Sequence, residues 1–199
     1  HNKLVESCID ISQADWNSQE TSWNFTLDYY SSSTIEGYIN SFIEFWVEKN
    51  KTLFSCEKSL DDYFFNNFNV QGESYESKRY ADYLINRDRI AIQQLEINKI
   101  ISNCIGCIMG RYSLDEPSLI YANSGNEGFD DLVERGAYTK FPADDDGIIP
   151  LTDKEWFADD AANRLVEFIS VAWPAENLEE NLDFLAANLS PKKGEDSRD

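Results

Sequence analysis

The sequence has very little histidine, and its acidic residues far outnumber its basic ones. The only histidine is His1, which makes a Ser-His-Asp or Cys-His catalytic arrangement implausible. Lysine and arginine number 17 against 37 acids, which gives a formal net charge of −20. Because nucleic-acid affinity comes mainly from Lys and Arg side chains that neutralise phosphates, this chain is a poor candidate for a DNA-binding surface. An acidic surface instead favours solubility, docking of a basic partner, or mimicry of DNA.

Long apolar runs and a secretion signal are also missing. No apolar run approaches the ~20 residues that are needed to cross a bilayer, and Glu6 and Asp10 interrupt the N-terminal region. The chain has 199 residues, of which 42% are hydrophobic and 14% aromatic, and this composition is typical of a globular protein. The chain begins with His1 rather than Met, and we interpret it as a fragment or a processed product.

Cysteine is scarce, with Cys8, Cys56, Cys104 and Cys107 as its only occurrences. A Cys-x-x-Cys pair can be half of a zinc site or a redox pair, but a zinc site needs two further ligands. Cys104 and Cys107 lie in an apolar stretch, so we expect them to be buried in a helix without a structural metal. Nothing indicates a disulfide framework. This absence favours a location in the reducing cytosol.

The dominant pattern along the chain is the 3.6-residue period of amphipathic helices, which predicts a mainly α fold. A first helix that stops near Trp16 is expected to carry Leu4, Cys8, Ile11 and Ala14. The serines at 31–33 are good N-caps for a second helix, whose apolar face comprises Ile35, Ile39, Phe42, Ile43 and Trp46. A shorter, separate helix is expected to carry Leu60, Tyr63, Phe64 and Phe68.

The same period predicts a long helix from about Lys78 to about Met109. Its apolar stripe is expected to comprise Tyr80, Tyr83, Leu84, Arg87, Ala91, Leu95, Ile101 and Ile105. Gly106 and Gly110 predict close packing and then a C-terminal stop.

The C-terminal third is predicted to be helical again. Thr152 and Glu155 have the spacing of a capping box, and Pro174 should end the helix that follows them. The buried face of that helix is expected to comprise Leu165, Phe168, Ile169 and Ala172. A last helix is expected to carry Leu178, Leu182, Leu185 and Leu189.

Between these helical parts, residues 113–150 are punctuated by glycine and proline and predict a long ordered loop region, with at most a short strand or hairpin at 119–121. Gly110–Pro150 is too apolar for a solvated tether, so we expect it to dock on the flanking helices. We expect one helical domain with a frayed, charged tail. The expected ranges are 1–190 for the domain, 1–112 and 151–190 for its lobes, 113–150 for the docked loop region, and 191–199 for the tail.

The middle region also contains candidates for chemistry, each with a simpler structural interpretation. Asp144, Asp145 and Asp146 precede Gly147, but a calcium loop needs alternating ligands and a distal Glu, so a solvated turn is favoured. Arg111 either pairs with one of these aspartates or lies exposed near a helix C-terminus. The glycine-rich residues 123–128 are a weak nucleotide-binding candidate. The tryptophans could stack on bases, although such residues more often pack in a core or interface.

Several segments resemble, in the same order, segments of the BREX-type adenine-specific DNA methyltransferases, also called phage growth limitation methyltransferases. Residues 15–25 are similar to their W-x-x-x-ETSW-x-F segment, and residues 105–115 to their GC-x-x-GRYSLD segment. Shorter matches follow at 121–129, 141–151, 156–157 and 179–182, whereas Phe54 to Gln94 fits the family poorly. The structural or interaction candidates are Trp23, Arg111, Tyr112, Asp144, Asp145, Asp146 and Trp156.

The resemblance implies a much longer parent protein that uses S-adenosylmethionine to methylate adenine N6 in a short DNA site and that marks self DNA in phage defence. The family's cofactor turn and its polar-Pro-Pro-aromatic loop have no counterpart here, so no catalytic, cofactor-binding or metal-binding residue is carried over. We therefore expect a non-catalytic helical spacer or interaction segment in the bacterial cytoplasm; the alternative is an acidic protein-interaction or DNA-mimic module. Its expected partners are other domains of the parent and other defence-system proteins, with DNA reached only through the parent and no membrane contact.

Overall fold

The computed structural model of this chain is built from helices and ordered loops. It describes residues 2–22, 24–26, 31–68, 89–121, 125, 127–152 and 156–189. Within these ranges there are six α-helices and one short 3-10 turn but no strand, which confirms the predicted mainly α fold. No strand forms at 119–121, where the sequence pattern allowed at most a short one. The backbone N–H groups of Ile120 and Tyr121 both reach the carbonyl of Arg111, so no strand ladder forms.

The chain divides into two compact units, and each unit is discontinuous in sequence. Unit 1 comprises His1–Phe25 and Asn40–Gln93, and unit 2 comprises Thr26–Ile39 and Gln94–Asp199. Residues 26–39 and 94–112 thus belong with the C-terminal half, and both lie within the range 1–112 that was expected to form one lobe. The tail at 191–199 lies outside the described residues. No helix in the described ranges is long and apolar enough to cross a membrane.

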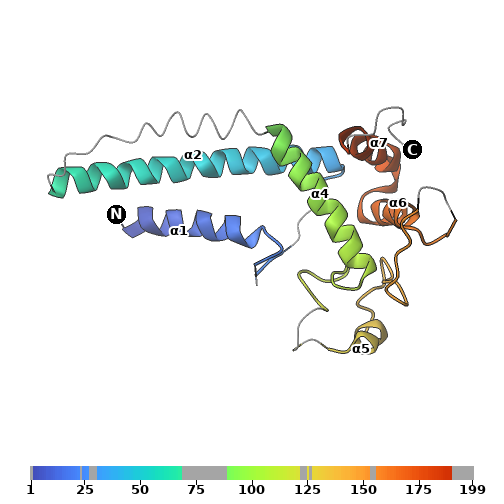
Figure 1. Cartoon of the computed structure of the whole chain (residues 1–199). Helices are drawn as coiled ribbons and strands as arrows, with labels where there is room; N and C mark the ends of the chain where they lie inside the picture. Colours follow the sequence, from blue (N-terminus) through green and yellow to red (C-terminus); the bar gives the residue numbers. More distant parts are fainter. Residues whose placement is uncertain are drawn as a thin grey trace. The chain divides into compact units, whose positions relative to one another are not determined.

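Unit 1 contains helix α1 (Asn2–Asn17) and most of helix α2 (Ile35–Phe68), which run in opposite directions (Figure 1). The expected first helix is confirmed, with Ile11 buried on its inner face. Cys8 of α1 lies beside Cys56 of α2, and their side chains form a hydrogen bond. Ala14, which was expected on the same face, is exposed.

Helix α2 is one continuous helix of 34 residues, which corrects the prediction of two separate helices. The stretch between them contains few apolar residues, among them Cys56, which is buried, and it contains no glycine or proline. Nothing therefore ends the helix. The hydroxyls of Thr52 and Ser59 donate to the carbonyls of Glu48 and Ser55 one turn earlier.

The N-terminus of α2, which belongs to unit 2, is capped by Thr34 and by a residue of a distant helix. The Thr34 hydroxyl accepts a hydrogen bond from the N–H of Gly37 at 3.1 Å, so the cap follows the predicted serines by at least one position. The N–H of Ile35 donates to the amide oxygen of Asn181 at 2.8 Å. Both donors are among the amides that a helix start leaves unpaired.

Helix α4 (Arg89–Ile108) contains the described part of the predicted long helix, but it buries a different face from the predicted one. The buried residues are Glu96, Ile97, Ile100, Asn103, Cys104, Gly106, Cys107 and Ile108. The predicted stripe residues Leu95 and Ile105 are about half exposed. The prediction failed because Glu96 and Asn103 are polar but lie on the buried face. The expected burial of Cys104 and Cys107 in a helix is confirmed. Predicted stripe residues at 80–87 lie outside the described residues.

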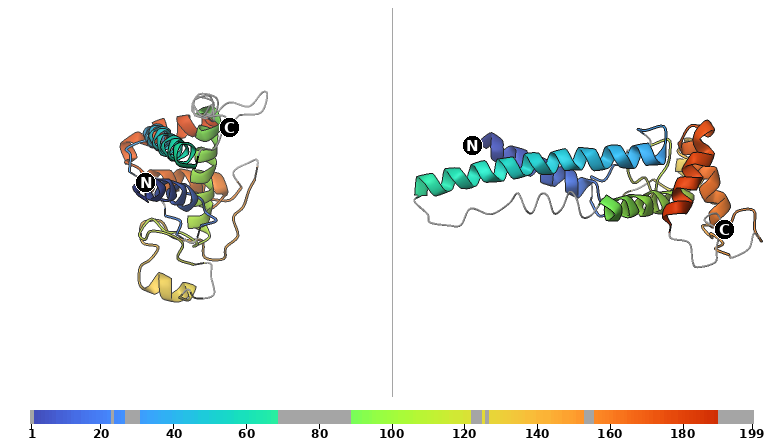
Figure 2. Two further views of the ribbon diagram at one scale, coloured as in Figure 1. Left: turned by 90° about the vertical axis from the view of Figure 1, so that its left-hand side faces the viewer. Right: turned by 90° about the horizontal axis from the view of Figure 1, so that it is seen from above.

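The C-terminal part of unit 2 contains helix α6 (Ala161–Ala172), the 3-10 turn η1 (Ala175–Asn177) and helix α7 (Leu178–Asn188), with α6 and α7 packed against each other (Figures 1 and 2). The N-cap of α6 is Asp160, whose carboxylate accepts from the N–H groups of Ala162 and Asn163. The helix therefore begins at Ala161 and not after Thr152, as the sequence pattern predicted, while Glu155 of the expected capping box lies outside the described residues. Phe168 and Ile169 are buried as expected, and α6 ends two residues before Pro174.

Candidate functional site

Residues 105–115, one of the segments that carry the motif resemblance, form the end of α4 and the turn that follows it. The N–H of Arg111 donates to the carbonyl of Gly106 at 2.8 Å, and the N–H of Gly110 donates to that of Cys107 at 3.1 Å. This is the Schellman arrangement, which needs a left-handed residue at the position of Gly110, whose φ is +70°. The predicted helix stop at Gly110 is thus confirmed. A Cβ on Gly106 would lie 2.4 Å from Tyr112, so the predicted close packing at Gly106 is confirmed too.

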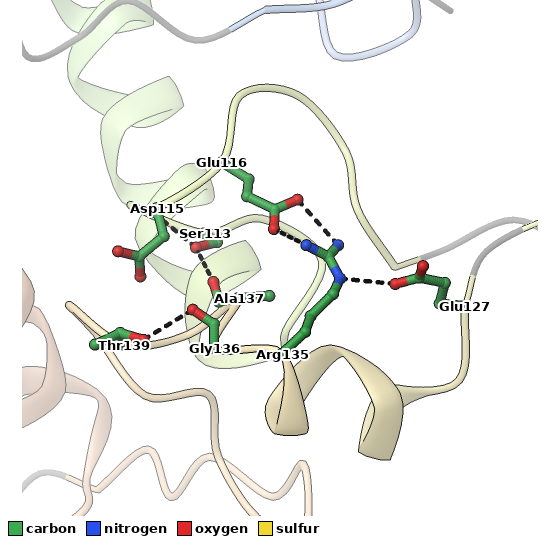
Figure 3. A network of polar contacts seen from close by, with 8 residues as sticks. All are labelled: Ser113, Asp115, Glu116, Glu127, Arg135, Gly136, Ala137 and Thr139. Carbon is green, nitrogen blue, oxygen red and sulfur yellow. Dashed lines mark hydrogen bonds and ion pairs between the residues drawn. The ribbon is translucent and has the colours of Figure 1, made fainter.

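After this turn the chain is held by side chains that hydrogen-bond to backbone groups (Figure 3). The hydroxyl of Ser113 donates to the carbonyl of Ala137 and accepts from the N–H of Asp115 at 2.8 Å. The carboxylate of Asp115 accepts from the N–H of Lys140 at 2.9 Å, and the Lys140 ammonium donates to the carbonyl of Leu114 at 2.9 Å. These contacts join residues 113–115 to residues 137–140, some 25 positions later.

Arg135 links three parts of the same loop region. Its guanidinium forms an ion pair with Glu116, with one Nη2–Oε2 distance of 3.1 Å, and its Nε donates to Glu127 at 2.7 Å (Figure 3). Hydrogen bonds first with Glu116 and then with Glu127 raise the pKa of Arg135. Arg135 follows helix α5 (Phe129–Glu134), a short helix that the sequence pattern did not predict. Since all three side chains are solvent-accessible, the network orients the loop and adds little stability.

A small apolar core lies beneath this network. Ile120, Leu132, Ala137 and Tyr138 are buried together, with Phe129 and Ala143 packed against them. The hydroxyl of Tyr138 donates to the carbonyl of Gly110 at 2.7 Å, which ties this core to the turn after α4. The expected docking of the loop region is therefore confirmed at its buried positions. Tyr121, which was also expected to pack, is 39% exposed but its ring centroid lies 5.7 Å from that of Phe129. Ile148, expected to pack as well, is exposed.

Arg164 of α6, rather than Arg111, is the arginine that binds residues 141–142 of the loop region. Its guanidinium lies over the ring of Phe141 at 4.3 Å, and its Nη2 donates to the carbonyl of Pro142 at 2.6 Å. Its side chain is only 14% exposed. Arg111 is exposed and lies near the ring of its neighbour Tyr112, and it forms no ion pair with Asp144, Asp145 or Asp146. The interpretation of Arg111 as an exposed cation after a helix end is the correct one.

Asp144, Asp145 and Asp146 form a turn, as their interpretation as a solvated turn rather than a calcium loop predicted. The carboxylate of Asp144 accepts from the N–H groups of Gly147 at 2.8 Å and Asp146 at 3.2 Å. Partial burial alone would raise the pKa of Asp144, but its hydrogen bonds with Asp146 and with the backbone hold that pKa below its usual value. The N–H of Asp144 donates to the carbonyl of Ile108 at 2.7 Å, so the turn is attached to the end of α4. Asp145 and Asp146 are exposed.

The remaining sequence candidates occupy separate places. Tyr112 is buried against α4, and Trp156 is 73% exposed. Trp23 lies outside the described residues, as do 123, 124 and 126 of the glycine-rich residues 123–128. Burial raises the pKa of the Cys104 and Cys107 thiols to about 12, so these thiols are poor nucleophiles and poor metal ligands at neutral pH. Across the described ranges, no group of His, Cys, Asp and Glu side chains has the arrangement of a metal site.

One further polar cluster was missed by sequence reasoning. Glu96 of α4 is buried, and its carboxylate pairs with the ammonium of Lys99 at 2.7 Å and accepts from the hydroxyl of Tyr38 at 3.1 Å. A carboxylate three positions before a lysine is visible in the sequence, but most such pairs lie on exposed helix faces. Nothing in the local pattern distinguishes this buried pair from the exposed one of Glu48 and Lys51.

The described residues thus define an acidic helical segment whose polar groups largely hold its own loop region in place. Comparison with known proteins identifies the family to which it is related. The chain is 38% identical over 96% of its length to the adenine-specific methyltransferase BrxX of Escherichia coli O9:H4 (strain HS). It is 32% identical over 99% of its length to the adenine-specific methyltransferase PglX of Lacticaseibacillus casei (strain Zhang). No family profile matches the chain.

These similarities confirm the family resemblance given by the sequence motifs. The chain is homologous to one segment of the BREX-type adenine-specific methyltransferases. It spans only 18% of the length of BrxX and 16% of the length of PglX.

Proposed function

We propose that this chain acts as a non-catalytic helical segment of an S-adenosylmethionine-dependent DNA adenine-N6 methyltransferase in a phage-defence system. One observation carries this proposal. The similarity to two such enzymes covers 96–99% of the chain but less than a fifth of either enzyme, and the sequence contains neither of the motifs that hold cofactor and flipped adenine. The segment holds neighbouring domains in the geometry that base methylation requires.

The packing of the loop region supports a scaffolding role. Methyl transfer to a flipped base tolerates little error, since a displacement near 1 Å can cost about 100-fold in rate. The long loop after α4 is fixed at several points, by Ser113 to Ala137, by Tyr138 to Gly110 and by Arg164 to Pro142. A loop held in this way can transmit a fixed orientation between the parts of a larger protein.

The net charge of the chain supports the proposal that other parts of the methyltransferase bind the DNA. A segment with a net charge of −20 repels phosphates, so DNA would be bound by other parts of the enzyme. The cofactor would likewise bind elsewhere, because no glycine-rich turn after a strand is present among the described residues. Isothermal titration calorimetry and gel-shift assays of the isolated chain should therefore detect neither cofactor nor DNA binding at physiological salt.

A second candidate function is an acidic docking module for a basic partner. The observation that favours it is a row of exposed carboxylates along η1 and α7. These residues recur at intervals of three and four positions, which places them on one helix face. They are Glu176, Glu179, Glu180 and Asp183.

One experiment on the full-length methyltransferase separates the two candidates. Arg164→Ala should loosen the loop region and lower adenine methylation, while the affinity for S-adenosylmethionine, measured by calorimetry, stays unchanged. Reversing the α7 charges with Glu179→Lys, Glu180→Lys and Asp183→Lys should leave methylation unchanged if the segment is a scaffold. A charge-reversed enzyme that methylates DNA normally in vitro but no longer protects cells against phage would favour the docking module instead.

A further inference from the structure

The segment between α5 and α6 exposes an unusual concentration of large apolar side chains. Leu151 is 87% exposed, Trp156 73%, Ile148 66% and Phe157 50%. We define these four residues as the apolar strip. They lie within ten positions of one another in unit 2, and the described residues of this range form no regular secondary structure. Single exposed apolar residues are normal on a protein surface, but a concentration of this kind marks an interaction site.

The backbone around the strip is held firmly enough to present it. The carboxylate of Asp146 accepts from the N–H of Ile148 at 2.8 Å, and the carbonyl of Pro150 accepts from the N–H of Ala161 at 2.9 Å. The carbonyl of Phe157 accepts from the N–H of Asp160, the N-cap of α6. Both ends of the strip are therefore fixed to ordered elements of the same unit. A preorganised strip loses less entropy on binding than a free peptide does.

The charges that flank the strip restrict its partner. Asp145, Asp146 and Asp159 are exposed beside it. The sequence from 141 to 160 contains seven acidic residues and one basic residue, Lys154, so the charge around the strip is strongly negative. A complementary surface would combine an apolar pocket for Trp156 and Leu151 with a basic rim. Tryptophan is among the residues that most often contribute the binding energy at the centre of an interface.

We propose that the apolar strip docks this segment onto another domain of the same methyltransferase polypeptide, through an apolar pocket with a basic rim. This inference rests on the proposed function. Outside the segment that matches this chain, each relative contains more than four times as many residues. A domain formed by those residues can cover the strip. An uncovered strip of this kind on a free protein would favour aggregation, which is a further reason to expect an occupant in the same chain.

Photo-crosslinking in the full-length methyltransferase tests the proposal. Leu151 is replaced by p-benzoylphenylalanine, which its exposure should tolerate, and Val133, a single exposed apolar residue of α5, receives the same replacement as a control. Irradiation of the Leu151 variant should join the strip to peptides of the same polypeptide outside this segment, identified by mass spectrometry, with a yield at least several-fold above that of the Val133 variant. Crosslinks to a second copy or to another protein, or a yield equal to the control, would overturn the proposal.

Adenine methylation by the same variants keeps this test separate from the test of the proposed function. A full-length protein that methylates adenine but gives no intramolecular crosslink at Leu151 overturns the docking proposal alone. A protein that gives the crosslink but methylates no adenine contradicts the proposed function and leaves docking within one polypeptide supported. In a third measurement, Trp156→Ala should increase the rate of proteolytic cleavage between the segment and its neighbours by several-fold, and an unchanged rate would count against the docking.

Discussion

Gly106 of α4 and Tyr112, six positions later, pack so closely that a single added carbon atom on Gly106 would lie 2.4 Å from Cδ2 of the tyrosine ring. The ring is buried and closes over the helix immediately after the turn at Gly110. This contact accounts for the presence of a glycine inside a helix, where glycine is otherwise unfavourable.

Gly106→Ala is therefore expected to destabilise the protein although alanine is the better helix former. Overpacking typically costs about 1–3 kcal/mol, whereas the gain in helix propensity is about 1 kcal/mol. Chemical denaturation should show a net loss on the order of 1 kcal/mol. The loss should shrink or reverse when the same change is made in a Tyr112→Ala background, since the clash is then gone. Equal effects in both backgrounds would mean that the ring does not cover Gly106.

Arg164→Ala should destabilise the protein far more than Arg111→Ala. The first change removes the hydrogen bond to the Pro142 carbonyl and the stacking on Phe141, for an expected cost of about 2 kcal/mol. Arg111 is exposed, so its removal should change the free energy of unfolding by less than about 0.5 kcal/mol. Thermal denaturation of both variants measures the difference. Similar melting temperatures for the two variants would contradict the assignment of Arg164 as the arginine that binds residues 141–142 of the loop region.

Glu96→Ala should be among the most destabilising changes in unit 2. It leaves the Lys99 ammonium and the Tyr38 hydroxyl without their carboxylate, and breaking a buried pair in this way costs roughly 3 kcal/mol or more. Glu48→Ala is the matched control, because Glu48 forms the same i,i+3 pair with Lys51 on an exposed face. Its effect should stay below about 0.5 kcal/mol. A small effect of Glu96→Ala in urea denaturation would show that Glu96 is not buried with these partners.

The buried thiols predict a loss of stability at alkaline pH. Burial raises the pKa of Cys104 and Cys107 to about 12, so the folded state keeps both thiols protonated. An unfolded chain ionises its thiols above roughly pH 8.5. Their contribution is therefore fully present below that pH and is lost as the pH rises toward 12. The Cys104→Ala/Cys107→Ala variant should show a flatter decline of melting temperature between pH 8 and pH 11 than the unmodified protein does. Parallel curves would argue against the burial of the thiols.

The same burial predicts the order in which the thiols react. Ellman's reagent at pH 8 should modify Cys8, the only one of the four that is not fully buried, well before Cys104 and Cys107. Cys8→Ser should remove the fast phase and leave the slow one, and full unfolding should make all remaining thiols reactive at once. A fast phase that persists in Cys8→Ser would show that one of the buried thiols opens locally.

The features that sequence reasoning predicted correctly are those encoded by neighbouring residues. The period of Ile35, Ile39 and Ile43 predicted the start of α2, and Gly110 predicted the end of α4, because helix faces and helix stops depend on residues within one or two turns. The acidic turn before Gly147 was predicted for the same reason.

The features that were missed depend on residues far apart in the sequence. The buried face of α4 includes Glu96, whose burial depends on Tyr38, 58 positions earlier. The choice of Arg164 over Arg111 depends on where Phe141 packs. At the start of α6, Thr152 and Asp160 both had the chemistry of an N-cap, and only the fold selects Asp160.

The hydrogen bond from the Ile35 N–H to Asn181 joins residues 146 positions apart, and the Ser33 carbonyl likewise accepts from the amide of Asn177. A ribosome synthesises the start of α2 long before it synthesises α7, so the newly made helix has its Thr34 cap but lacks the Asn181 side chain that accepts from the N–H of Ile35. Unit 2 can be completed only when nearly the whole chain has emerged. Deletion of residues 174–199 should therefore loosen the first turns of α2 as well, because their folded state depends on a side chain that is synthesised 146 positions later.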